Sequence, residues 1–112
     1  MRPGERRHRG AISRRAVGEA LEIEALARGY DAHVPRLALL RRCRELRYTP
    51  EIDRLEAVVR ELQGVGAVEV TEVGVRYTPA GRAWQGSGWH QSAWRALERR
   101  AERAREVHDV LT

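Results

Sequence analysis

The sequence predicts a mostly α-helical domain that carries one small β-hairpin and ends in a long helix. Apolar side chains recur at helical spacing in three segments before residue 64. Residues 67–72 then alternate apolar with polar side chains, Val73-Gly74 forms a turn, and residues 75–78 return. Such alternation is typical of a hairpin that buries one face. With 112 residues, the chain is long enough for one such domain and too short for two.

The net charge of the chain is concentrated at its N-terminus. All 21 basic residues are arginines, and the formal net charge is +5. Residues 1–15 hold six arginines against Glu5, so they account for the whole excess. The lone Cys43 cannot form an internal disulfide, and we therefore expect a reducing, cytoplasmic location. The apolar runs are too short for a membrane span, and no apolar segment follows the basic N-terminus as in a secretory signal.

The first helix is expected to begin after a flexible arm. Residues 1–12 hold almost nothing to bury and are predicted to form this arm. Ser13 is then expected to cap a helix that runs to about Arg28 and stops at Gly29.

Two further helices are expected before the hairpin. The second covers residues 34–46, with Asp31 as its expected cap. Its apolar stripe consists of Leu37, Leu40, Cys43 and Leu46. The break at Thr49-Pro50 starts the third helix, which covers residues 50–63.

The hairpin is followed by two helical segments. Gly74 is expected to supply the positive φ of the hairpin turn. Thr78-Pro79 places a capping hydroxyl before a proline at the first helical position. This helix is expected to run to about Gln85, before a break at residues 86–88 in which Ser87 caps the last helix.

The last helix, from Trp89 onward, contains a heptad seam. Its members are spaced 3, 4, 3, 4 and 3 residues apart: Trp94, Leu97, Ala101, Ala104, His108 and Leu111. The facing helix belongs either to this chain or to a second copy. Trp84, Trp89 and Trp94 lie five residues apart, a spacing that would scatter them around one continuous helix. They are expected to fill separate pockets, and a ligand pocket built from them is the less favoured alternative.

This order of elements resembles the recognition helix, wing and following helix of winged helix-turn-helix proteins. The segment 76–82, Arg-Tyr-Thr-Pro-Ala-Gly-Arg, is similar to the wing ending of PadR-type and MarR-type transcriptional regulators. The resemblance implies a winged-helix domain over residues 13–85, and residues 86–112 resemble the dimerisation helix of PadR-type regulators. The function implied is that of a homodimeric transcriptional regulator that binds duplex DNA, either sequence-specifically or generally.

Arginines around the second helix are the main candidates for DNA contact, because the guanidinium fork suits phosphate oxygens. The expected contacts come from Arg36, Arg44, Arg47, Thr49, Arg54 and Arg76, with Arg6, Arg7 and Arg9 from the arm. The arm either follows a minor groove, binds phosphates without order, or has no partner. The hairpin turn carries no cation and is expected mainly to cover the core.

The third helix favours an alternative interpretation. Glu51 and Asp53 at its start would repel phosphates. The alternative is a winged-helix module that binds protein rather than DNA, such as an adaptor on a transcription or replication complex, including one of phage type. No spacing of His, Cys or carboxylate residues points to catalysis, a metal or a cofactor. We therefore expect no enzymatic activity.

Overall fold

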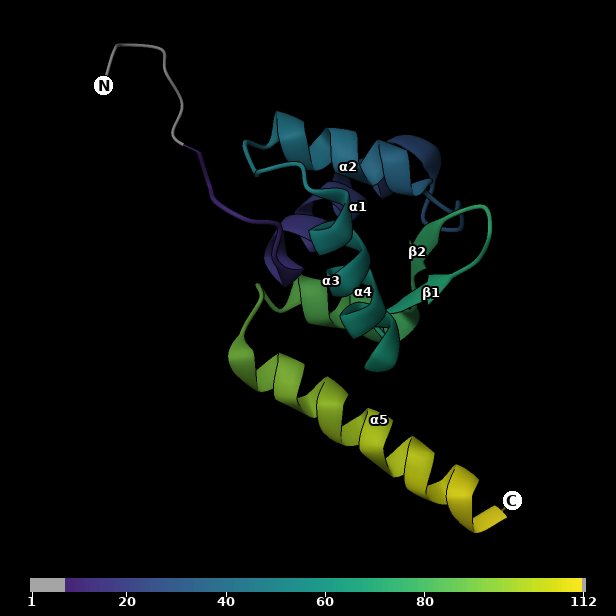
Figure 1. The fold of residues 1–112 in the computed structure, drawn as a ribbon. Coiled ribbons are helices and arrows are strands. Elements are labelled where there is room, and N and C mark those ends of the chain that lie inside the picture. Colours follow the sequence, from purple (N-terminus) through teal and green to yellow (C-terminus); the bar gives the residue numbers. More distant parts are fainter. Residues whose placement is uncertain (1–7, 112) are drawn as a thin grey trace.

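The structure is a computed structural model that describes residues 8–111, and for Leu111 its backbone alone (Figure 1). It is mostly helical and contains one small antiparallel hairpin, as the sequence predicts. In chain order, the elements are α1 (Arg14–Arg28), α2 (Arg36–Glu45), α3 (Ile52–Gly64), β1 (Val68–Val70), β2 (Val75–Tyr77), α4 (Pro79–Gly86) and α5 (Gln91–Leu111). Within residues 8–111, no helix is both long and apolar enough to cross a bilayer.

Helix α1 forms the centre of the core and packs against both α2 and α3. Its start is where the sequence places it, because the Ser13 hydroxyl accepts a hydrogen bond from the Ala16 amide at 3.2 Å. Fully buried aliphatic side chains from all three helices meet there, among them Leu21, Leu39 and Leu55.

The expected starts of α2 and α3 are wrong. Asp31 is exposed and caps nothing; α2 begins after Pro35, which provides no side-chain cap. Helix α3 begins at Ile52, two residues after Thr49-Pro50. Thr49 does not cap α3: its hydroxyl lies 3.4 Å from His8 Nδ1, and its amide donates to the Gly10 carbonyl at 2.9 Å.

The apolar stripe predicted for α2 is partly wrong. Cys43 is fully buried, but Leu37 is 69% exposed, and Leu40 and Leu46 are only half-buried. Leu39, rather than Leu37, fills the core beside Cys43. Helix α2 therefore faces the core with a stripe displaced from the predicted one, and it presents leucines to solvent.

The hairpin pairs Val68 with Tyr77 and Val70 with Val75. The residues before α2 join it, because Val34 and Val75 exchange two backbone hydrogen bonds of 2.8 and 2.9 Å. The expected positive φ at Gly74 is not present. A Cβ atom at this position would instead lie 2.2 Å from the Val34 carbonyl oxygen, so glycine is required by the close approach of another segment.

Helix α4 begins as predicted, since the Thr78 hydroxyl accepts a hydrogen bond from the Gly81 amide at 3.1 Å. Ser87 does not cap α5. Its hydroxyl donates to the Trp84 carbonyl at 2.7 Å and so closes the end of α4. Helix α5 then runs along the bottom of the domain in Figure 1, and its C-terminal part projects beyond the other elements.

The three tryptophans form one cluster, which corrects the expectation of separate pockets. The ring centroid of Trp84 lies 4.9 Å from that of Trp89 and 5.2 Å from that of Trp94, both in edge-to-face arrangements. The break between α4 and α5 makes this possible, because it turns the second helix back across the first. Together with Arg14 and Arg15, the rings line a cavity of about 290 Å³.

The heptad seam of α5 is divided between two environments. Trp94 and Leu97 are buried in the core of this chain, and Ala101 is half-buried. Ala104 and His108 are exposed, and the side chain of Leu111 lies outside the described part. The facing surface for the first half of the seam thus belongs to the same chain.

Candidate nucleic-acid interface

The N-terminal segment lies beside the connector between α2 and α3. The Arg9 amide donates to the Arg47 carbonyl at 2.8 Å, and Ala11 forms a parallel bridge with Thr49. Ile12 is fully buried. Residues 8–12 are therefore held against the domain, which corrects the expectation of an arm that reaches to residue 12. Arg6 and Arg7 lie outside the described residues.

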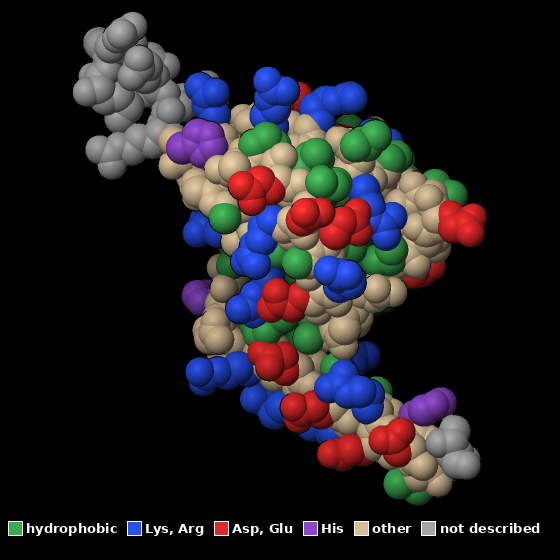
Figure 2. Space-filling view, viewed as in Figure 1, with side chains coloured by type: hydrophobic (Ala, Val, Ile, Leu, Met, Phe, Trp, Pro, Cys, Tyr) green, Lys and Arg blue, Asp and Glu red, His purple; other side chains and the backbone are tan. Residues whose placement is uncertain are grey.

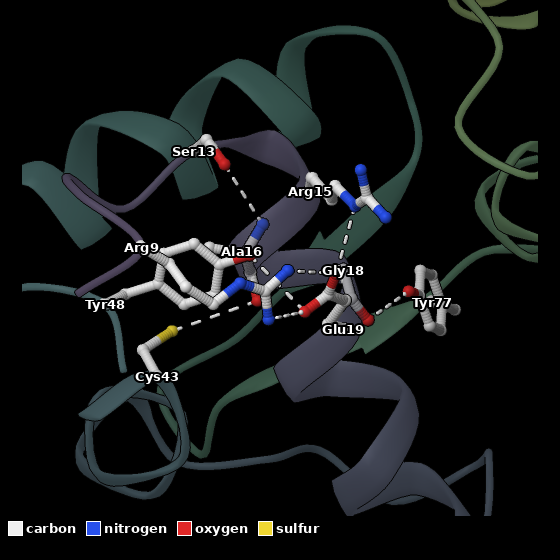
Figure 3. Close-up of polar contacts among 9 residues, drawn as sticks. All are labelled: Arg9, Ser13, Arg15, Ala16, Gly18, Glu19, Cys43, Tyr48 and Tyr77. Carbon is white, nitrogen blue, oxygen red and sulfur yellow. Dashed lines mark hydrogen bonds and ion pairs between the residues drawn. The ribbon is translucent and has the colours of Figure 1, made fainter. Parts of the chain in front are cut away.

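Glu19 of α1 fixes this segment in place (Figure 3). Two guanidinium nitrogens of Arg9 reach its carboxylate at 2.9 and 3.1 Å, and Arg15 Nε reaches it at 3.0 Å. The Arg9 guanidinium also lies 4.5 Å from the centre of the Tyr48 ring. Burial alone would raise the pKa of Glu19, but the hydrogen bonds from Arg9 and Arg15 outweigh burial and lower it. Arg9 thus attaches the segment to the domain.

Three of the other predicted DNA contacts are engaged within the domain. Arg36 Nε lies 2.8 Å from Glu56 Oε1 on α3. Arg54 Nε donates to the Ile12 carbonyl at 2.8 Å. Arg76 Nη2 lies 2.8 Å from Glu69 on the neighbouring strand and holds the pKa of that carboxyl below its usual range. A phosphate at any of these positions would compete with a partner already present.

Arg44 and Arg47 differ from these three. Both are exposed, and within residues 8–111 neither guanidinium has a hydrogen-bond or ion-pair partner. Arg41, one helical turn before Arg44, is also exposed, and its guanidinium has no such partner among these residues. Figure 2 shows basic side chains along the upper edge of the molecule, over α2. We call Arg41, Arg44 and Arg47 the arginine edge. The predicted DNA contacts do not include Arg41. Its i, i+3 spacing to Arg44 is the sequence signal that could have identified it.

Arg47 occupies a position that usually belongs to glycine. Its φ is 75°, in the left-handed region. The amide of Arg47 donates to the Arg44 carbonyl at 3.0 Å, and that of Tyr48 donates to the Cys43 carbonyl at 3.0 Å. This pair of bonds is the Schellman ending of a helix, in which the left-handed residue is most often glycine. An arginine there carries a backbone cost, and strain of this kind is commonly found at functional positions.

The exposed face of α3 carries both signs of charge. Glu51, Asp53 and Glu61 are exposed there, together with Arg54 and Arg60. Figure 2 shows acidic and basic side chains side by side below the upper edge. The arginine edge is therefore the more uniformly cationic of the two surfaces.

The lone thiol does not form a chemically reactive site. Cys43 is buried, and burial raises its pKa to about 11. No cluster of His, Cys, Asp and Glu side chains suited to a metal ion occurs in the part of the chain that the structure describes. No protein-family model matches the chain, and neither curated proteins nor solved structures include one significantly similar to it.

Proposed function

We propose that this protein binds duplex DNA through the phosphate backbone, with the arginine edge as its principal contact. In this proposal the fold is a winged helix-turn-helix, in which α2 and α3 are the helix pair and β1 and β2 are the wing. The observation that carries the proposal is the set of three exposed guanidinium groups with no partner in residues 8–111. Guanidinium groups bind phosphate bidentately, and each neutralised phosphate releases counterions.

The proposed binding is largely independent of base sequence. Reading bases would place the start of α3 in the major groove. Glu51 and Asp53 lie at that start, and the Nε donor of Arg54 is engaged by the Ile12 carbonyl. Contacts to phosphate position a protein on DNA but carry no direct sequence information. A general affinity for duplex DNA follows from this balance of charges.

We further propose that the DNA-binding form is a homodimer acting as a transcriptional regulator in the cytoplasm. The projecting half of α5 exposes Ala104 and Val107 on neighbouring turns, beside the half-buried Ala101. A second copy would cover this stripe. Val107→Glu should then lower the mass measured by light scattering to that of a monomer. An unaltered mass would exclude this surface as the dimer contact.

Fluorescence anisotropy with two unrelated duplexes of equal length tests the DNA proposal. The variant Arg44→Ala with Arg47→Ala should bind both duplexes about tenfold or more weakly, which corresponds to about 1.4 kcal/mol. The matched control removes two exposed arginines from α5, Arg99→Ala with Arg103→Ala. This control should bind nearly as well as the unaltered protein. Equal losses in both variants would mean that net charge, and not the arginine edge, governs binding.

The acidic surface of α3 supports a second candidate function, that of a protein-interaction module. Glu51, Asp53 and Glu61 are exposed, and the hairpin turn carries Glu72 with no cation. A basic protein partner fits such a surface better than DNA does. Absence of duplex binding at low salt and micromolar protein would favour this second function over the first.

A further inference from the structure

A groove beside the arginine edge is more apolar than contact with DNA requires. It is an open hollow of about 350 Å³, lined by Leu37, Leu40, Arg41, Arg44 and Pro50. We call it the α2 groove. Its four helical residues follow the spacing i, i+3, i+4 and i+7, so they form one face of α2, and Pro50 of the connector closes the groove.

The apolar part of this groove is exposed to solvent. Leu37 is 69% exposed, and Pro50 is exposed at the other wall. In Figure 2, apolar side chains appear among the basic ones along the edge over α2. Phosphate oxygens gain nothing from contact with a leucine, so the DNA-binding role leaves these side chains unexplained. Here the exposed apolar side chains border a hollow that a partner's side chain can enter, and charged side chains rim it, as at surfaces that bind another molecule.

The charged rim of the groove indicates the chemistry of the partner. Arg41 and Arg44 lie on it, and neither has an acidic partner among the residues that the structure describes. The acidic Glu45 is turned to Arg42, with 2.7 Å between their nearest atoms, and does not line the groove. A partner that fits must therefore offer apolar side chains to the floor and carboxylates to the rim.

We propose that the α2 groove binds an acidic peptide segment of a protein partner, with one or two aliphatic side chains entering beside Leu37. This proposal rests on the proposed function, because the peptide shares Arg41 and Arg44 with DNA. The two ligands therefore exclude each other, and an acidic partner releases the protein from DNA. A hollow favours insertion of a partner's side chain over contact with a flat anionic membrane.

The binding test uses a fluorescein-labelled probe peptide that carries two leucines four residues apart among aspartates and glutamates. Leu37→Ala should weaken its binding about tenfold. Leu26→Ala is the matched control, because Leu26 is 70% exposed, lies on α1 and does not line the groove. This control should leave peptide binding unchanged. Since Leu37 is exposed, its replacement is not expected to disturb folding, which circular dichroism will verify.

Two altered peptides separate the apolar from the charged contribution. Replacement of both leucines by serine should weaken binding as much as Leu37→Ala does. Replacement of the acidic residues by their amides should weaken binding strongly, and this weakened peptide should bind the unaltered protein and Arg44→Ala equally well. Undiminished binding of either altered peptide would overturn the proposal. It would mean that charge alone, or apolar contact alone, accounts for peptide binding.

A competition experiment tests the link to DNA. Unlabelled probe peptide should displace a labelled duplex, whereas Leu37→Ala should retain DNA affinity within about twofold and resist that displacement. Formation of a ternary complex would overturn the inference, as would Leu37-dependent binding to vesicles that contain phosphatidylserine. If the unaltered protein binds duplex DNA but not the probe peptide, this inference alone is refuted. If it binds the probe peptide but not duplex DNA, the proposed function is refuted.

Discussion

The indole of Trp89 lies so close to the backbone of Gly18 that a Cβ atom at position 18 would overlap its ring. A Cβ atom there would approach Trp89 Cη2 to 2.1 Å and Cζ3 to 2.2 Å. Trp89 itself has a φ of 67°, in the left-handed region, and its ring packs edge-to-face on Trp84. This contact joins the middle of α1 to the break between α4 and α5, and so ties the C-terminal helix to the rest of the domain.

Gly18→Ala should destabilise the protein by about 1–3 kcal/mol, because the added methyl group displaces the Trp89 ring from a packed site. Urea unfolding followed by circular dichroism measures this change. In a Trp89→Ala background, the same substitution should be neutral or stabilising by up to about 1 kcal/mol, since alanine is the better helix former. An equal cost in both backgrounds would show that the two residues are not coupled.

Glu19→Gln should weaken the attachment of the N-terminal segment while preserving the size of the side chain. The expected loss at neutral pH is about 1 kcal/mol or less, because the Arg9 side chain is 39% exposed and its ion pair is screened by water. The neutral amide that replaces the carboxylate cannot carry the charge that Arg9 and Arg15 both contact.

The difference in stability between the unaltered protein and Glu19→Gln should become smaller as the pH falls. The folded-state pKa of Glu19 is lowered from its usual 4.5. The stabilisation is therefore fully present above about pH 4.5 and is lost as the pH falls through the lower, folded-state value. Urea midpoints measured from pH 7 down to pH 3 should converge for the unaltered protein and Glu19→Gln. A difference that stays constant over this range would contradict the role given to Glu19.

Arg47→Gly should separate stability from DNA binding. A left-handed conformation costs a residue other than glycine about 1–2 kcal/mol. Replacement by glycine removes this cost and so increases stability. Part of the increase is offset by the greater freedom of glycine in the unfolded chain, about 0.4–1 kcal/mol. The variant should therefore unfold at an equal or higher urea concentration, yet bind duplex DNA more weakly.

Arg47→Ala is the control for this prediction, because it removes the guanidinium but retains the constrained backbone. Its stability should match that of the unaltered protein, and its DNA affinity should match that of Arg47→Gly. A marked loss of stability in Arg47→Gly would mean that the side chain of Arg47 is needed for the fold.

The elements that the sequence predicted correctly are those decided by neighbouring residues. Ser13 and Thr78 cap their helices through amides three residues away, so their roles are visible in a short stretch of sequence. Thr49 has the same local appearance as Thr78, with proline after it in both cases. Its hydroxyl nevertheless faces His8, and its amide donates to Gly10, 39 residues earlier along the chain. No local pattern reveals such contacts.

The same distinction applies to the candidate interface. The arginine cluster near the end of α2 was evident from the sequence, and Arg44 and Arg47 retain the exposure expected of DNA contacts. The partners of Arg36 and Arg76 come from other elements, Glu56 of α3 and Glu69 of the opposite strand. The exposure of Leu37 also depends on how α2 is rotated against α1, which its ambiguous apolar pattern does not determine.

The salt dependence of DNA binding tests the central claim most directly. The logarithm of the association constant should fall linearly with the logarithm of salt concentration, with a slope of about −0.9 per neutralised phosphate. Removal of Arg44 and Arg47 together should reduce the magnitude of this slope by about 1.8, equally for unrelated duplexes. A slope identical to that of the unaltered protein would show that these two guanidinium groups do not contact phosphate, and would contradict the proposed DNA-binding role of the arginine edge.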